Sequence, residues 1–156
     1  MSIENVRADL ARYGLADRIR EFDTSSATVA EAAAAIGCEE RQIAKTLSLY
    51  VGTDPTVIVV AGDARIVNAK YKAQFHTKPR MIPAGEVEAA VGHAPGGVCP
   101  FGLKEGVAVY LDESLRRFDA VYPACGSSNS ALRITLPELE RVSHLVAWVD
   151  VCKGWD

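Results

Sequence analysis

A lysine interrupts an apolar strand pattern at a position where a buried charge is costly. Residues 43–51 alternate as a half-buried strand does, and Lys45 falls on the apolar face with Leu47 and Leu49. An ammonium group that faces a core or a cleft needs a partner, and burial lowers its pKa. Lys45 is therefore a candidate functional residue. The structural alternative is a lysine near the start of a strand that extends its ammonium group to solvent.

A glycine-rich loop, residues 92–102, is the second candidate for chemistry. Glycines let the main chain approach a ligand, and backbone N–H groups can stabilise an ester oxygen as it becomes an oxyanion. Cys99 lies inside this loop, but the sequence shows no general base or activating cation for it, so we do not favour a nucleophilic role. His93 could relay protons, although a histidine that hydrogen-bonds a backbone carbonyl is the favoured interpretation.

Other catalytic signatures are missing from the sequence. It contains no dinucleotide-binding or phosphate-binding glycine motif and no His-Glu-x-x-His. The four cysteines, at positions 38, 99, 125 and 152, form no Cys-x-x-Cys pair, and the three histidines add no zinc-binding spacing. We expect reduced thiols, no metal and no cofactor.

Length and composition indicate a globular protein. A chain of 156 residues with 49% hydrophobic content fits one domain, residues 1–156, with room for a core. No apolar run approaches the roughly 20 residues of a membrane span. The first seven residues lack the basic and apolar regions of a secretory signal, so we expect a cytoplasmic protein that binds no membrane.

The charge is distributed unevenly along the chain. The net charge is −3, which argues against a strongly basic protein that binds DNA or RNA in general. Residues 64–85, however, contain five lysines and arginines and no acid. This segment suits a transient contact with the phosphates at one end of an RNA, although a solvated basic helix face explains the composition equally well.

The pattern of expected elements predicts a mixed α+β fold of the α/β class. We expect helices at 2–13, 28–37, 68–75 and 84–91 and one that begins at 137, with Thr28 and Glu31 forming a capping box and Asn68 a cap. Because helices and strands do not alternate regularly, the sheet should be mixed, mostly antiparallel and flanked by helices. The expected strands cover residues 20–23, 43–51, 56–61, 107–111, 120–125, 132–136 and 145–151.

Several of these segments together resemble the YbaK/ProX family, whose members are relatives of the editing domain of bacterial prolyl-tRNA synthetases. The resemblance covers roughly residues 20–152 and is carried by residues 28–33, 42–47, 62–65, 96–103 and 124–130 in one order. It implies a compact α/β domain with a mixed sheet. The implied activity is hydrolysis of the ester that joins a wrong amino acid to a transfer RNA.

The resemblance also implies roles for individual residues. Lys45 matches a lysine that holds the phosphate of the terminal adenosine, and the loop from Gly96 to Pro100 matches one that surrounds the aminoacyl carbonyl. Thr46 should point to the opposite face of a regular strand from Lys45. The implied catalytic residues are Lys45, Gly96, Gly97, Val98 and Pro100, and the implied substrate-binding residues are Thr46, Cys99, Phe101, Gly126, Ser127, Asn129 and Ser130.

By the same resemblance, the enzyme positions a water or a substrate group rather than using a protein nucleophile. The expected partners are the 3′ end of a mischarged tRNA, bound transiently, and an aminoacyl-tRNA synthetase. Cysteine, alanine, serine and threonine esters all remain open as substrates. A non-catalytic module that binds an RNA end or a nucleotide is the alternative function, and a small-molecule esterase is less favoured because no nucleophile is evident.

Overall fold

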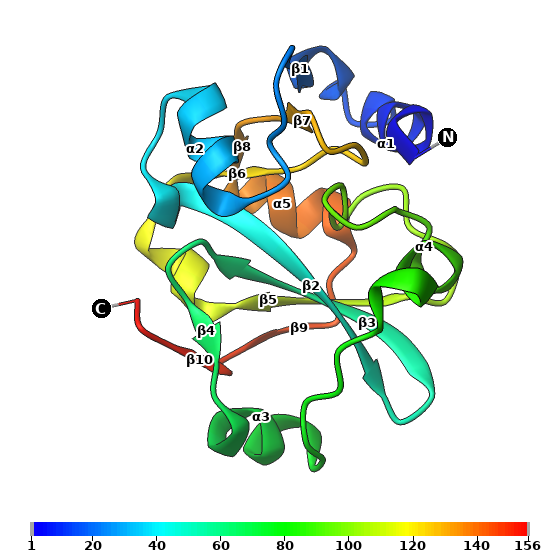
Figure 1. Ribbon diagram of the computed structural model, residues 1–156, viewed down its shortest axis with the longest axis vertical. Helices are drawn as coiled ribbons and strands as arrows, with labels where there is room; N and C mark the ends of the chain where they lie inside the picture. The colour runs from blue at the N-terminus through cyan, green and yellow to red at the C-terminus, as the bar shows by residue number, and fades with distance from the viewer. Residues whose placement is uncertain (1, 156) are drawn as a thin grey trace.

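The computed structural model describes residues 2–155 and is built around a six-stranded sheet (Figure 1). Its strands lie in the order β8, β6, β2, β3, β5, β9. Two short antiparallel pairs, β1 with β7 and β10 with β4, lie outside this sheet. The bounds are β1 Arg20–Glu21, β2 Ile43–Val51, β3 Asp54–Ala61, β4 Arg65–Ile66, β5 Ala108–Asp112, β6 Ala120–Pro123, β7 Ser130–Ala131, β8 Ile134–Thr135, β9 Ala147–Val149 and β10 Cys152–Lys153.

The centre of the sheet is the hairpin of β2 and β3. Their register runs from Ala44 opposite Ala61 to Val51 opposite Asp54, so Gly52 and Thr53 alone form the turn. Gly52 has φ +64°, a conformation that glycine adopts without strain. Residues 57–61 of β3 are fully buried, as the uninterrupted apolar run predicts for a central strand.

The sheet is mixed, as predicted, but its antiparallel share is smaller than expected. Only β2 with β3 and β6 with β8 pair antiparallel, whereas β2 with β6, β3 with β5 and β5 with β9 pair parallel. Parallel neighbours need long crossover connections. Two such connections are present, because residues 62–107 lie between β3 and β5, and residues 113–146 lie between β5 and β9.

Within residues 2–155, five α-helices flank the sheet, with α3 at the opposite end of the molecule from α1 and α2 in Figure 1. The capping box of Thr28 and Glu31 is present at the start of α2, and Gly37 and Gly92 end α2 and α4 in the left-handed conformation. The expectation for Asn68 was wrong: it is the first residue of α3, and Val67 occupies the cap. The helices are α1 Ser2–Ala11, α2 Val29–Ile36, α3 Asn68–Phe75, α4 Ala84–Val91 and α5 Leu136–Ser143.

Most buried apolar side chains form one core around β3, to which α1, α3, α4 and α5 all contribute. A smaller cluster joins Ala32 and Ala33 of α2 to Ile43 of β2. Among residues 2–155, no helix is long and apolar enough to cross a membrane.

Candidate functional site

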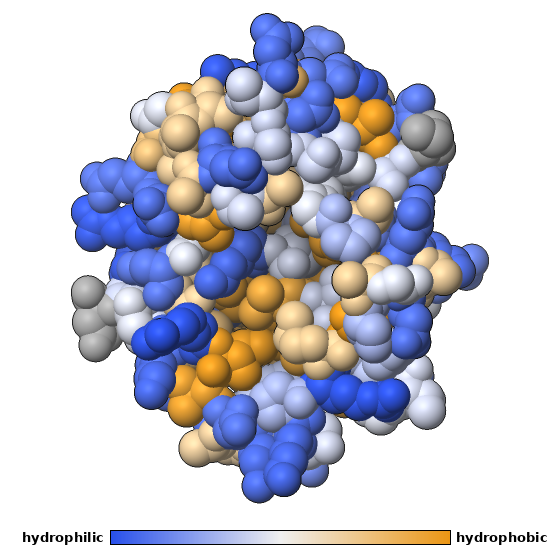
Figure 2. All heavy atoms as spheres, viewed as in Figure 1, coloured by the Kyte–Doolittle hydropathy of each residue, from blue (hydrophilic) through white to orange (hydrophobic). Residues whose placement is uncertain are grey.

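A cavity of about 310 Å³ lies beside β2, between α2, α4 and the loop that follows α4. Figure 2 shows apolar side chains gathered near the middle of this face of the molecule, with hydrophilic side chains around them. The lining residues are Ser26, Ala27, Thr28, Val29, Ala32, Ile43, Ala44, Lys45, Thr46, Leu47, Ser48, Met81, Ile82, Ala84, Val87, Pro95, Gly96, Val98, Tyr122, Ala124, Ser130 and Ala131.

The cavity exists because the edge of β2 is covered only at its two ends. Strand β6 pairs with β2 at Ile43 and Ala44. Farther along, Ile82 N–H donates to Ser48 O at 3.0 Å and Tyr50 N–H donates to Arg80 O at 2.9 Å. Residues 45–47 lie between these two contacts and line the cavity. Lys45 and Thr46, whose side chains point to opposite faces of the strand, can therefore both line the cavity.

Lys45 is the only charged side chain among the described residues that line the cavity. It is half-buried, and its Nζ donates to the carbonyl oxygen of Gly62 at 3.4 Å. Burial lowers the pKa of the ammonium group, and the nearby Asp63 carboxylate opposes part of that shift. The side chain is thus held by the protein and does not simply extend into solvent.

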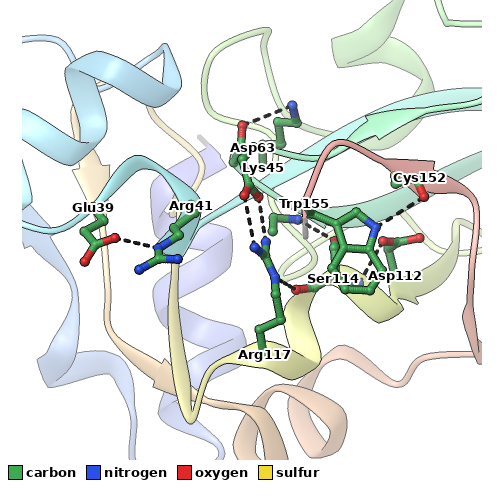
Figure 3. A network of polar contacts seen from close by, with 11 residues as sticks. Glu39, Arg41, Lys45, Asp63, Asp112, Ser114, Arg117, Cys152 and Trp155 are labelled. Atoms are coloured by element: carbon green, nitrogen blue, oxygen red, sulfur yellow. Dashed lines mark hydrogen bonds and ion pairs between the residues drawn. The ribbon is translucent and has the colours of Figure 1, made fainter.

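A polar network holds the turn that supplies the Gly62 carbonyl (Figure 3). Arg117 donates to both carboxylate oxygens of Asp63, at 2.6 and 3.0 Å, and to Ser114 O at 3.0 Å. These hydrogen bonds lower the pKa of the Asp63 carboxyl group. The Ser114 hydroxyl accepts from Ala61 N–H at 3.0 Å, at the end of β3. One distant segment, residues 114–117, therefore fixes the position of the group that binds Lys45.

Thr46 contributes a buried hydroxyl to the wall of the cavity. Its Oγ1 has no hydrogen-bond partner within residues 2–155, although it is shielded from solvent. A buried hydroxyl without a partner is destabilising, so such a group in a cavity wall is suited to bind a polar atom of a ligand. Strand β2 is regular through residues 44–51, and Thr46 lines the cavity at the uncovered part of the edge of this strand.

The glycine-rich loop places only part of its predicted residues at the cavity. Gly96 and Val98 line it, whereas Gly97, Pro100 and Phe101 do not. The Gly97 N–H already donates to Ala94 O at 3.1 Å, so it is not available to an ester oxygen. The amides of Gly96 and Val98 donate to no group in the part of the chain that the structure describes. Any backbone donors that this loop offers to a ligand therefore come from these two residues.

Cys99 and His93 lie in the core rather than at the cavity, and each is fully buried. The Nε2 of His93 is 2.6 Å from Phe101 O, so it must carry the proton of that hydrogen bond. It therefore cannot accept a proton from the Cys99 Sγ, which is 3.6 Å away. Burial raises the pKa of the Cys99 thiol to about 12. His93 therefore hydrogen-bonds a backbone carbonyl, which is the interpretation that the sequence favoured. Cys99 and His93 do not form a nucleophile and general base.

The late glycine loop contributes Ser130 alone to the cavity from the predicted set. The Ser127 hydroxyl lies 2.9 Å from Asn129 Oδ1 and 2.7 Å from Ser130 Oγ, and the Asn129 amide donates to Phe22 O at 3.0 Å. Gly126 has φ +93°, and a Cβ there would lie 2.8 Å from the backbone of Ser2. Gly126, Ser127 and Asn129 thus hold the loop against its neighbours instead of lining the cavity.

A family model described as the aminoacyl-tRNA editing domain matches residues 23–142. The chain belongs to this family. The match includes Lys45, the loop after α4 and the late glycine loop. It confirms the resemblance that the sequence motifs carried.

Relatives of this editing domain include proteins with and without an assigned activity. YwhH of Bacillus subtilis, an uncharacterized protein, is 46% identical over 157 residues and covers the whole of both chains. EbsC of Enterococcus faecalis, named as a proposed Cys-tRNA(Pro)/Cys-tRNA(Cys) deacylase, is 31% identical over 73% of this chain and 69% of its own. The crystal structure of a proposed trans-editing enzyme for prolyl tRNA synthetase superposes with a TM-score of 0.87 at 29% identity, covering 98% of each chain.

The cavity is also lined by residues that the sequence motifs did not indicate. Ser26 and Ala27 come from the segment before α2, Ala84 and Val87 from α4, and Tyr122 from β6. They are small or apolar residues without a chemical signature, so their sequence pattern indicated only helix or strand. Among residues 2–155, no three His, Cys, Asp or Glu side chains are grouped to hold a metal ion.

Proposed function

We propose that this editing domain is a trans-acting deacylase, which hydrolyses the ester between a wrong amino acid and the 3′ end of its tRNA. The observation that carries the proposal is the composition of the cavity. One cation, Lys45, lies in an otherwise uncharged cavity beside two backbone amides, of Gly96 and Val98, that no described group occupies. The family and the names of the relatives support the same activity. The reaction belongs in the cytoplasm, where aminoacyl-tRNA is used.

Each part of the cavity has a distinct role in this proposal. Lys45 binds the phosphate of the terminal nucleotide, because an ammonium group pairs well with a phosphate in a partly desolvated site. The ester carbonyl lies near the Gly96 and Val98 amides, which stabilise the oxyanion as it forms. The apolar walls, including Val29, Ala32 and Ile82, contact the amino-acid side chain. The Thr46 hydroxyl, which has no partner within residues 2–155, is available to its polar atoms, whereas the Ser130 hydroxyl is already hydrogen-bonded to Ser127.

The chemical step needs no protein nucleophile. A water molecule adds to the ester carbon, the bond between that carbon and the ribose oxygen breaks, and the water's proton passes to the ribose oxygen. The products are a free amino acid and an uncharged 3′ end. Because Cys99 and His93 are buried away from the cavity, the rate derives from orientation of the ester and from stabilisation of the oxyanion. The adenosine 2′-hydroxyl is well placed chemically to assist the proton transfer.

The direct test is to incubate the purified protein with a panel of tRNAs charged with cysteine, alanine, serine, threonine and proline, and to measure release of free amino acid. We expect rapid release from at least one mischarged tRNA. Lys45→Met should lower kcat/KM by about 10²-fold, because it removes the phosphate partner. Lys70→Met is the matched control, since Lys70 binds Asp150 and Cys152 O and does not line the cavity.

Two results would contradict the proposal. Tight binding of every charged tRNA without release would favour the non-catalytic RNA-binding function instead. Near-normal turnover by Lys45→Met, with an unchanged far-UV circular dichroism spectrum, would remove the role given to Lys45.

A further inference from the structure

A second hollow, of about 320 Å³, adjoins the candidate site. Tyr122 and Ala131 line both spaces, so the two share a wall formed by β6 and β7. Helix α2 also contributes to both, through Val29 and Ala32 to the cavity and through Ile36 to the hollow. A ligand that extends out of the cavity past Tyr122 would therefore enter the hollow.

Three arginines, Arg18, Arg20 and Arg133, line the hollow, and each of these residues is exposed. The single acid among the lining residues, Glu138, is bound at both oxygens by Arg18, at 2.6 and 2.8 Å. Arg20 lies over the ring of Phe22 at 5.2 Å, and Arg133 has no ion pair or hydrogen bond within residues 2–155. Two positive charges thus remain uncompensated beside a concave surface, which favours an anionic ligand.

The hollow also has apolar surface suited to a nucleotide. Tyr122 is half-buried and presents an aromatic ring at the shared wall, and Leu132 and Ile36 complete the apolar side. Aromatic rings that stack on bases, combined with arginines that bind the backbone, are the usual elements of a single-stranded RNA site. Neither the ring nor the arginines have a role in the chemical step described above.

We propose that this hollow binds the nucleotide preceding the terminal adenosine, with its phosphate between Arg20 and Arg133 and its base or ribose against Tyr122. The inference rests on the proposed function, which places the terminal nucleotide in the cavity. The RNA strand then runs along the exposed arginines rather than over the basic segment 64–85. On that other side, Arg80 lies over the ring of Tyr50, next to the cavity residues Met81 and Ile82.

The test measures binding of an uncharged RNA hairpin that ends in the tRNA 3′ sequence, by fluorescence anisotropy between 50 and 200 mM salt. Arg20→Ala and Arg133→Ala should each weaken binding by about three- to tenfold at low salt. Each should also lower the slope of log affinity against log salt by about one. Arg116→Ala is the matched control, because Arg116 lies over Trp148 of β9, at the opposite edge of the sheet from β8.

A variant expected to strengthen binding guards against misfolding as an explanation. Glu138→Gln removes the acid of the hollow but keeps a side-chain oxygen that can accept from Thr135 N–H in the capping box. We expect it to bind the hairpin more tightly than the unmodified protein does. Unchanged affinity and salt slope in both Arg20→Ala and Arg133→Ala would overturn the proposal, and a loss in Arg80→Ala alone would place the strand on the other side.

This outcome can be separated from failure of the proposed function. The anisotropy measurement uses uncharged RNA and needs no hydrolysis. If no charged tRNA is deacylated but the arginine variants still lose affinity, the proposed function fails and the RNA subsite stands. If deacylation occurs and the arginine variants bind normally, the subsite fails alone.

Discussion

The main chains of Gly97 and Gly126 are in direct contact. Gly126 N–H donates to Gly97 O at 3.0 Å, and a Cβ at position 97 would lie 2.7 Å from the carbonyl carbon of Gly126. Real Cβ atoms do not approach backbone atoms so closely, so only glycine fits at position 97. This contact joins the loop after α4 to the late glycine loop, and it holds Gly96 and Val98 at the cavity.

Gly97→Ala should therefore destabilise the protein. We expect the free energy of unfolding to fall by about 1–3 kcal/mol, because the added methyl group forces the two loops apart. Deacylation should fall in parallel, since Gly96 and Val98 move with the loop. The measurement is the thermal midpoint together with single-turnover deacylation of the same sample.

Gly85→Ala is the control for this substitution. Gly85 lies in α4 with nothing within 4 Å of the position of a Cβ, so alanine there should raise the free energy of unfolding by about 0.5–1 kcal/mol. A Gly97→Ala protein of normal thermal midpoint that binds RNA but fails in the chemical step would instead indicate a direct role for the Gly97 amide.

Thr46→Val should separate stability from activity. Valine keeps the shape of threonine but removes a buried hydroxyl that has no partner within residues 2–155, so the free energy of unfolding should rise by about 1 kcal/mol. If the hydroxyl binds the substrate, deacylation falls at the same time. Chemical denaturation and steady-state kinetics of the same variant test both effects.

Thr56→Val provides the opposite case in the same sheet. The buried Thr56 hydroxyl donates to Asp54 O at 3.1 Å, so its removal leaves that hydrogen bond unmade and should be destabilising. If Thr46→Val also lowered stability, the Thr46 hydroxyl would have a partner in solution that the structure does not show.

Cys99→Ala should retain deacylation when activity is expressed per folded molecule. The thiol is fully buried, does not line the cavity, and has a pKa raised by burial to about 12, so it is neither accessible nor ionised at neutral pH. Trapping of an acyl group on Cys99 by mass spectrometry would contradict this prediction.

Thiol labelling of the native protein gives an independent measurement of the same burial. Cys38 is half-buried, whereas Cys99, Cys125 and Cys152 are buried. Iodoacetamide should therefore modify Cys38 first, although burial also raises the pKa of that thiol and slows its reaction. The other three should react only when the protein unfolds. Early modification of Cys99 would show that the loop after α4 opens in solution.

As the pH is raised, the affinity for RNA should begin to fall at a lower pH than it would if Lys45 had the pKa of an ordinary lysine. Burial lowers the pKa of Lys45, so the ammonium group that binds phosphate loses its proton at a lower pH than a solvent-exposed lysine does. Binding of uncharged RNA is the suitable measurement, because aminoacyl esters hydrolyse spontaneously in alkali. Lys45→Met should bind weakly at every pH and lack this titration.

The same shift has a defined sign for stability. Between the folded and the unfolded pKa of Lys45, the unfolded chain binds more protons, so the free energy of unfolding rises with pH across that window. Lys45→Met should remove this part of the rise, whereas Lys70→Met should keep it. An identical pH dependence in both variants would contradict the burial of Lys45.

Local signals in the sequence were sufficient to predict most of the helices and strands. The alternation of residues 43–51 predicted β2 with its observed bounds, and the capping box of Thr28 and Glu31 predicted the start of α2. These signals depend on backbone conformation and on hydrogen bonds between residues a few positions apart. The prediction that Asn68 caps α3 was wrong, because a residue type that often caps helices can also be the first residue of one.

Only the tertiary structure decided which residues of a motif face the cavity. The sequence alone determined that this chain has a lysine on the apolar face of a strand, a glycine-rich loop and the motifs of an editing domain. Gly97 and Cys99 belong to that loop, yet contact with Gly126 and with His93 directs them away from the cavity. Likewise, Arg20 and Arg133 line one hollow only because β1 pairs with β7. The pairing of β1 with β7 joins segments more than 100 residues apart. Such contacts follow from packing of the whole core, which no local pattern encodes.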